Sequence, residues 1–395
     1  MNNTHKAYLR NIYLDFIHVF IRNLNVTHGI WMAYLYIEKG FTLWELGVFE
    51  GIFHFASITM EVPTGVFGDL VGRKLSRVFG LLSMIIYIAL VLLGSEFWII
   101  ALGFFVCGLG YTFESGSGEA LVYDSLIELN KEDTFMKVQG IKEILFQVSS
   151  SIALFIGGYL ALVRYEINYY VMFIVFVTAL IPILLMKEIR HINVEKPIKF
   201  KNRMYEHFII SSQIVFNNKK LRNLILISAL LLAPVTTMFF FQQNYLIGLK
   251  YDISFVGLVL GFHSIAGAVG GYVAHKLERK FKETLIIYIV PIFLVISFWI
   301  VLIDSIVYIP FVILGFLDSI FYVVISDYIN RQIPSAQRAT ILSFTNLAFS
   351  IVMIILFPII GFIAEFSTLR NSFIVLAAIV SISYISLLST VDFQD

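Results

Sequence analysis

The sequence predicts an all-α polytopic membrane protein in which twelve transmembrane helices form two pseudo-symmetric six-helix bundles. Of its 395 residues, 59% are hydrophobic and only 14% are charged, whereas a soluble domain is about 45–50% apolar and about 25% charged. The apolar runs are continuous and reach about 20 residues, the length of a spanning helix, without the alternation of a β-barrel. A loop that recurs at half the chain length predicts two related halves.

Continuous apolar runs divide the chain into twelve expected spans. Tiny polar turns, such as the one at residues 94–96, separate some of them. We expect the spans at residues 11–37, 43–67, 78–95, 97–127, 138–163, 167–187, 221–247, 254–277, 283–303, 306–330, 337–365 and 370–390.

One long polar connection, residues 188–220, separates the two predicted bundles at residues 1–187 and 221–395. The connection is basic, and 23 of the 28 Lys and Arg residues fall on one side of the predicted membrane, against four on the other. Because cationic loops stay in the cytoplasm, we expect a multi-pass protein of the cell inner (plasma) membrane with both termini cytoplasmic. Contact with lipid headgroups or a regulator is the alternative role for this basic segment.

The turn between the second and third spans combines two glycines, a carboxylate and three cations in the stretch Gly65–Arg77. A weaker copy, which lacks the acid and one glycine, follows 206 residues later at Gly271–Lys280. We expect Gly65 to allow a close helix approach where a Cβ would clash, and Gly72 to permit the tight turn. The alternative is that the cations only fix topology, which would require neither the acid nor the glycines.

Ionisable and polar residues recur at helical spacing inside the first two spans. A charge at the bilayer centre costs about 2.5–3.5 kcal/mol, so such residues tend to face a cavity or each other. For each histidine and for Glu61, the acid beside the turn, we expect a structural hydrogen bond, and proton coupling is the alternative. The first span carries Asp15, His18, Arg22 and Asn25 on one helical face, and the second carries Glu50, His54, Ser57 and Glu61.

Twelve spans, a basic central connection and the pattern Gly-x-x-x-Asp-x-x-Gly-Arg-Lys-x-x-Arg at Gly65–Arg77 together resemble the major facilitator superfamily. The preceding stretch Glu61–Gly65 resembles that of bacterial drug-exporter-like members. The resemblance implies the major facilitator fold and a conformational latch at the cytoplasmic side, in which Asp124 is the partner of Arg73. The implied latch residues are Gly65, Asp69, Gly72, Arg73, Lys74, Arg77 and Asp124.

In that family, spans one, four, seven and ten line the substrate cavity, which would bring Arg22 near Glu114 and Asp318. Arg22 keeps its proton and requires a carboxylate or an anionic substrate as partner, and a purely structural ion pair is the alternative. The candidates for binding substrate or protons are Arg22, Glu114, Glu119, Asp318, Asn25, Asn346, Tyr111 and Tyr245. The candidates for a proton relay or a structural role are Asp15, Glu61, His18 and His54.

The candidate residues carry more acids than cations, and their aromatic neighbours can add cation–π contacts. We therefore predict a secondary active transporter that exports small amphipathic or cationic compounds by proton antiport with alternating access. Proton-coupled or facilitated uptake of a small nutrient is the alternative transport function. A polytopic membrane enzyme or receptor is the alternative from another class.

The sequence offers no nucleotide loop, metal cluster or nucleophile triad. We therefore expect no enzymatic activity, no cofactor and no metal. The expected partners are a small-molecule substrate, protons as the coupling ion and the lipid bilayer, without nucleic acid. We expect the chain to act as a monomer.

Overall fold

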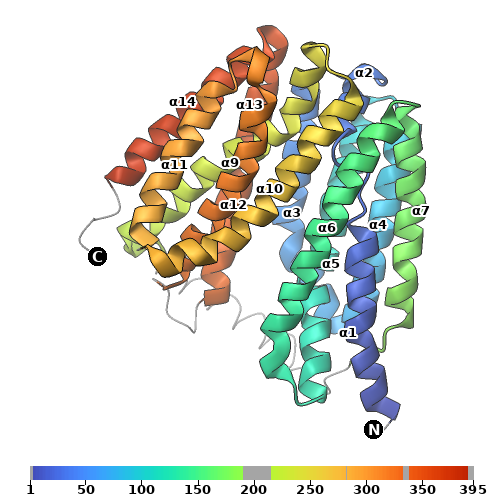
Figure 1. Cartoon of the computed structure of the whole chain (residues 1–395). Coiled ribbons are helices and arrows are strands. Elements are labelled where there is room, and N and C mark those ends of the chain that lie inside the picture. The colour runs from blue at the N-terminus through green and yellow to red at the C-terminus, as the bar shows by residue number, and fades with distance from the viewer. Residues whose placement is uncertain (1–2, 190–214, 282, 332–337, 390–395) are drawn as a thin grey trace. The chain divides into compact units, whose positions relative to one another are not determined.

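The computed structural model describes residues 3–189, 215–281, 283–331 and 338–389, and these residues form helices and no strands (Figure 1). This confirms the predicted all-α fold class. The short 3-10 helices are η1 (Glu132–Thr134) and η2 (Asp304–Ile306). The α-helices are α1 (Asn3–Arg22), α2 (Trp31–Ile37), α3 (Leu43–Val71), α4 (Arg73–Leu93), α5 (Phe97–Glu128), α6 (Phe135–Ala161), α7 (Tyr165–Leu185), α9 (Lys219–Gly248), α10 (Ile253–Lys280), α11 (Glu283–Ile300), α12 (Tyr308–Arg331), α13 (Arg338–Phe366) and α14 (Leu369–Leu388).

Within the described ranges, nine helices are long and apolar enough to cross a membrane, and Thr284–Ile300 is a shorter apolar helix. Large apolar side chains cover the outer surface, as Trp98 (79% exposed) and Leu93 (87% exposed) illustrate, which is the pattern of a surface that faces lipid. The polar helices α1 and α3 are not among the nine. The chain is therefore a multi-pass membrane protein.

The first predicted span, residues 11–37, is not one helix. Helix α1 ends at Arg22 and α2 begins at Trp31, and the backbone between them is irregular. The Asn25 side chain accepts hydrogen bonds from the backbone N–H (3.2 Å) and the hydroxyl (2.6 Å) of Thr27. With its amide oriented to satisfy both groups, the buried Asn168 donates to the carbonyl of Val26 (3.0 Å). The non-helical backbone therefore finds partners inside the bundle, as a bilayer requires.

The chain divides into two compact units. Unit 1 comprises Met1–Arg190 and Leu246–Gly261, and unit 2 comprises His191–Tyr245 and Phe262–Asp395. In unit 1, Gly257 approaches Gly158 so closely that a Cβ on Gly158 would lie 2.9 Å from the Cα of Gly257. The expected boundaries at 1–187 and 221–395 remain predictions, since most of the expected linker, 188–220, lies outside the described residues.

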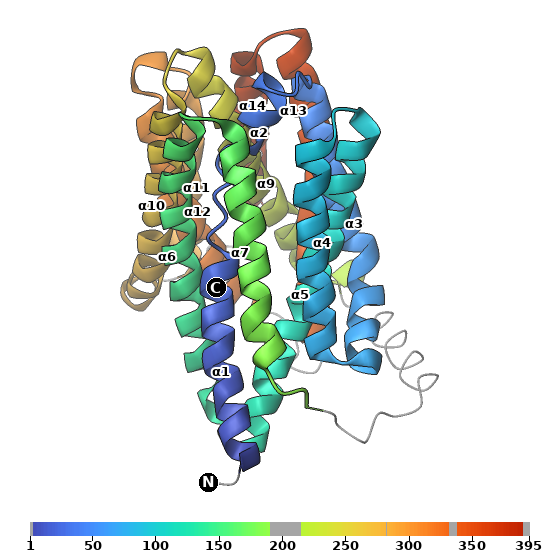
Figure 2. The same cartoon turned by 90° about the vertical axis from the view of Figure 1, so that its right-hand side faces the viewer.

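Both units pack the same pairs of helices, which makes them pseudo-symmetric. In each unit the third span packs on the fourth and on the sixth, and the fifth packs on the sixth. In unit 1 these pairs are α4–α5, α4–α7 and α6–α7 (Figure 2). In unit 2 they are α11–α12, α11–α14 and α13–α14. A Cβ on Gly108 of α5 would strike the Phe53 carbonyl of α3, and one on Gly315 of α12 would strike the His263 carbonyl of α10. The second and fourth spans of each unit therefore meet at an equivalent glycine.

A single residue, Gly72, separates α3 from α4 and has φ +128°. Only glycine adopts that conformation readily, which confirms the prediction for this turn. In the weaker copy, Glu278 occupies the equivalent position and α10 continues as a helix to Lys280. Where the glycine is replaced, the helix therefore continues two residues beyond the equivalent position before it ends.

Candidate functional site

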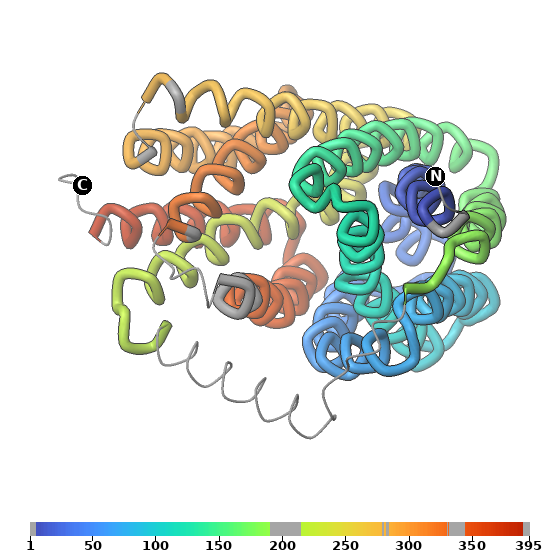
Figure 3. Tube along the Cα trace, turned by 90° about the horizontal axis from the view of Figure 1, so that it is seen from below, coloured from blue at the N-terminus to red at the C-terminus, as the bar shows by residue number. Residues whose placement is uncertain are grey.

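A buried cluster of five ionisable side chains lies where α1, α4, α5 and α6 meet. Arg77 donates to Glu114 from both Nε (3.0 Å) and Nη2 (2.8 Å), and its Nη2 lies 2.7 Å from Asp15. Lys142 completes the pairing of Asp15 at 3.0 Å, and His18 lies 3.1 Å from Glu114. In Figure 3, α1 lies beside α6 and α7, with which it packs. The cluster therefore ties four helices together at the end of unit 1 where the chain begins.

Two of these cations, Arg77 and Lys142, were counted among the charges on the basic side of the predicted membrane, and the structure places both inside helices. Arg77 lies inside α4 and is fully buried, and Lys142 lies inside α6 and is half-buried. They enter the helices because Asp15 and Glu114 require partners: an unpaired ion in a low-dielectric interior costs several kcal/mol. Lys142 was missed as a site residue, although a lysine next to the apolar core of the fifth span was a signal for it.

Arg22 does not pair with Glu114, contrary to the expectation that the two would come together. The acid is already occupied by Arg77 and His18, and Arg22 instead lies over the ring of Tyr111, 5.1 Å from its centroid. Arg22 is the last residue of α1, where the negative end of the helix dipole favours a cation. Tyr111 is exposed and presents its ring to this guanidinium.

The second face of polar residues, on α3, contains one close acid–base pair. His54 Nε2 lies 3.7 Å from Glu50 Oε1, one helical turn away. Phe53 makes edge contacts with both His54 and Tyr111, which connects this pair to the aromatic partner of Arg22. Glu61, on the same helix, is exposed, and its expected structural hydrogen bond is not found among the described residues.

The ion pair expected between Arg73 and Asp124 is present at 3.0 Å, and Asp69 lies 3.9 Å from Arg73. The role of these residues as a latch remains a proposal. Lys74 donates through Nζ to the carbonyls of Leu184 (2.7 Å) and Met186 (2.9 Å) at the end of α7. The Gly65–Arg77 stretch is therefore tied to both α5 and α7.

Glu188 is a residue that the sequence reasoning missed. Its carboxylate accepts hydrogen bonds from the backbone N–H groups of Arg73 (3.2 Å) and Lys74 (2.8 Å). These are free donors in the first turn of α4, where a negative charge also complements the helix dipole. The signal was an acid directly after the sixth span, at the start of a basic segment.

Within unit 1, the structure places the close helix approach at Gly68 and not at Gly65. A Cβ built on Gly65 meets no described atom within 4 Å, whereas one on Gly68 would lie 2.8 Å from the Ser117 hydroxyl of α5. Ser117 in turn donates to the hydroxyl of Ser76 (2.9 Å). The close approach of α3 to its neighbours is therefore made one helical turn further along the chain than predicted.

Exchange of Gly72 for alanine is expected to destabilise the protein by about 1–3 kcal/mol, the cost of a non-glycine residue in such a conformation. The new Cβ would also lie 2.9 Å from the Glu188 carboxylate. Gly65→Ala is the matched control, because it adds the same atom in a helix with open space. Thermal unfolding of the two purified variants in detergent compares them, and an equal loss in both would contradict this account.

Unit 2 contains an ion pair that also involves its fourth span but joins it to the second span. Arg331 of α12 donates to Glu278 of α10 at 2.8 Å and also pairs with Asp327, one turn before it. The first unit places its cation, Arg73, on α4 and its acid, Asp124, on α5. Each unit therefore has a charged connection to its fourth span, built from different residues.

The remaining candidates belong to different units: Glu119 to unit 1, and Tyr245, Asp318 and Asn346 to unit 2. Tyr245 is buried and donates to Asp304 (2.7 Å) in η2, and its role in substrate binding stays a prediction. Asn346 and Glu119 are exposed on α13 and α5. Asp318, in the middle of α12, has a buried Oδ1 for which the described residues provide no hydrogen-bond partner. Within the described ranges no cluster of His, Cys, Asp and Glu could hold a metal ion.

Among the described residues, these features define a helical membrane protein with two repeated units, an intramembrane ion cluster and an intramembrane acid on α12 whose buried oxygen lacks a hydrogen-bond partner. The family model of the Major Facilitator Superfamily matches residues 16–356. The chain therefore belongs to the Major Facilitator Superfamily and is a transporter. Comparison of the sequence with curated proteins finds no match.

Solved structures with the same fold transport chemically different solutes. The nucleoside transporter NupG is similar over 100% of both chains, with a TM-score of 0.81 and 12% identity. A bacterial homologue of the iron transporter ferroportin has a TM-score of 0.75 and 13% identity, over 98% of each chain. A D-xylose–proton symporter has a TM-score of 0.70 and 13% identity, again over 98% of each chain. At these identities the likeness establishes the fold alone.

Proposed function

We propose that this transporter exports small amphipathic or cationic compounds in exchange for protons. The observation that supports this proposal is Asp318, a half-buried acid in the middle of α12 whose Oδ1 has no hydrogen-bond partner among the described residues. An unpaired carboxylate inside a membrane is costly. It is stable there when it holds a proton or when a cationic ligand supplies the missing charge.

Those two states are mutually exclusive, and this exclusion is the basis of antiport. A proton on Asp318 removes the charge that attracts a cation, and a bound cation favours the ionised form. By linkage, each ligand lowers the affinity for the other by the same factor. An inward proton gradient would then drive the export of a cation.

Glu114 contributes differently from what the sequence suggested. Two hydrogen bonds from Arg77 and the contact with His18 occupy its Oε1, so its charge is compensated within unit 1. We therefore assign the binding of a cationic substrate to Asp318 and not to Glu114. Arg22 and Tyr111 remain candidates for contact with the polar part of an amphipathic substrate.

Accumulation in inside-out membrane vesicles tests the direction and the coupling of transport. Vesicles that contain the protein are given a pH gradient in which the lumen is acidic, together with a panel of cationic, neutral and anionic compounds. We expect uptake of cationic or amphipathic members, which corresponds to export from a cell, and loss of uptake when a protonophore removes the gradient. Accumulation only in right-side-out vesicles would favour nutrient uptake, and accumulation that survives the protonophore would contradict proton antiport.

A further inference from the structure

We propose that His18 and Glu114 form a proton-binding site in which one proton ties α1 to α5. The fully buried ring of His18 contacts one acceptor through each nitrogen. Nδ1 lies 3.0 Å from the carbonyl oxygen of Ala179 on α7, and Nε2 lies 3.1 Å from Oε1 of Glu114 on α5. A carbonyl oxygen can only accept, so Nδ1 carries a hydrogen.

The second contact then requires an additional proton. A neutral imidazole with its hydrogen on Nδ1 has a lone pair on Nε2. That lone pair would face an ionised carboxylate oxygen, which also has no hydrogen to donate. The 3.1 Å contact is a hydrogen bond only when a proton lies between Nε2 and Oε1. The geometry therefore describes the proton-loaded form of the pair.

The neighbouring donors place this proton on the histidine. Oε1 of Glu114 already accepts two N–H groups from Arg77, which leaves no direction for a hydrogen of its own. Its other oxygen, Oε2, has no hydrogen-bond partner among the described residues to receive such a hydrogen. His18 is then an imidazolium, and the acid stays ionised.

The charges that surround the site make the proton releasable. Asp15 and Glu114 are balanced by Arg77 and Lys142, so the cationic ring is one charge in excess of a neutral cluster. Arg22, one turn further along α1, adds to that excess. On the α7 side the contact is the Ala179 carbonyl, which is uncharged. Histidine is the side chain whose charge changes in the physiological range, and release of the proton would replace the α1–α5 hydrogen bond by repulsion.

The site has a use only if protons drive transport, and to that extent it rests on the proposed function. Its existence is tested without any substrate. Histidine side-chain nitrogens are followed by NMR in the purified, 15N-labelled protein in nanodiscs between about pH 5 and 8. The signal of His18 is identified by its absence in His18→Gln, or in His18→Asn if the first variant does not fold.

We expect both nitrogens of His18 to carry hydrogens at the acidic end of the range, and Nε2 to lose its hydrogen as the pH rises. Glu114→Gln removes the charge that holds the proton and should move the midpoint down by roughly one to three pH units. Glu128→Gln, which changes an exposed acid on the same helix, is the matched control and should leave the midpoint unchanged. A ring that stays neutral throughout, or a midpoint that ignores Glu114→Gln, would overturn the proposal.

Failure of this test is distinguishable from failure of the proposed function. The NMR experiment contains no solute and no gradient, so it reports the proton site alone. The vesicle experiment reports exchange whether or not His18 binds the proton. A titrating His18 in a protein that shows no proton-driven accumulation would retain the site and remove the antiport mechanism.

Discussion

Replacement of Arg77 by methionine is expected to lower the free energy of unfolding by about 3–5 kcal/mol, the cost of leaving a buried ion without its partner. The guanidinium of Arg77 is shared by Asp15 and Glu114, so its loss affects two acids at once. Methionine has similar length and keeps the apolar contacts of the side chain. Thermal or chemical unfolding of the purified protein measures the change.

Neutralisation of the two acids provides the control for this prediction. When Asp15→Asn, Glu114→Gln and Lys142→Met accompany Arg77→Met, the paired acids and cations are removed together, and most of the lost stability should return. Lys74→Met removes a cation of the same turn whose amine contacts only carbonyl groups at the end of α7, and should cost less. A single Arg77→Met variant as stable as the native protein would show that the cluster does not hold the helices together.

Replacement of Asp318 by asparagine is expected to abolish proton-driven accumulation while the protein still folds. The amide cannot exchange a proton for a cation, and its NH₂ group has the wrong polarity for a cationic substrate. The buried Oδ1 has no partner among the described residues, so the exchange removes no known contact. The vesicle assay measures accumulation, and size-exclusion chromatography in detergent checks folding.

Asp252→Asn is the matched control for this second prediction. It makes the same chemical change at an exposed residue just before α10, and asparagine is as good a helix cap as aspartate. We expect this variant to transport like the native protein. Unimpaired proton-driven accumulation by Asp318→Asn would remove this acid from the mechanism.

The spacing of Asp15 and His18 predicted correctly that they share one face of the first span, and the resemblance supplied the Arg73–Asp124 pair. The same spacing argument failed for Asn25, because it assumed one continuous helix. Asn23, Asn25 and Thr27 are residues that favour turns, and this cluster was the available signal for the break after Arg22.

The partners within the site depended on packing that one helix cannot reveal. Either Arg22 or Arg77 could have neutralised Glu114, and only the approach of α4 to α5 selects Arg77. The sequence also could not decide whether Gly65 or Gly68 makes the close helix contact. Both lie on α3, and only packing shows that Gly68 faces Ser117. The capping of α4 by Glu188 joins residues 114 positions apart.

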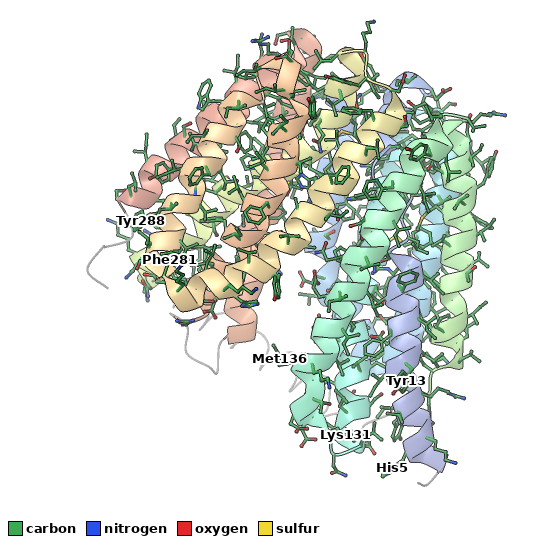
Figure 4. The ribbon with its side chains drawn as sticks, viewed as in Figure 1. His5, Tyr13, Lys131, Met136, Phe281 and Tyr288 are labelled. Carbon is green, nitrogen blue, oxygen red and sulfur yellow. The ribbon has the colours of Figure 1, made fainter. Side chains whose placement is uncertain are left out.

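Charged and aromatic residues also mark the ends of the units. Figure 4 shows His5 and Lys131 at one end of unit 1. Tyr13 and Met136 lie nearer the middle of the unit. His5 belongs to α1, and Lys131 to the turn between α5 and α6. The N-terminus and this turn therefore lie on one side of the membrane, which agrees with the arrangement that the Lys and Arg distribution predicts.

The central claim is that solute and protons move in opposite directions through this protein. Proteoliposomes that enclose a pH-sensitive dye test it most directly. A transported cation is added outside, and its gradient is the only one across the membrane. We predict that inward movement of the cation drives protons out, so that the lumen becomes alkaline in the native protein and not in Asp318→Asn. Movement of the cation without any change in lumenal pH, or acidification of the lumen, would contradict the claim.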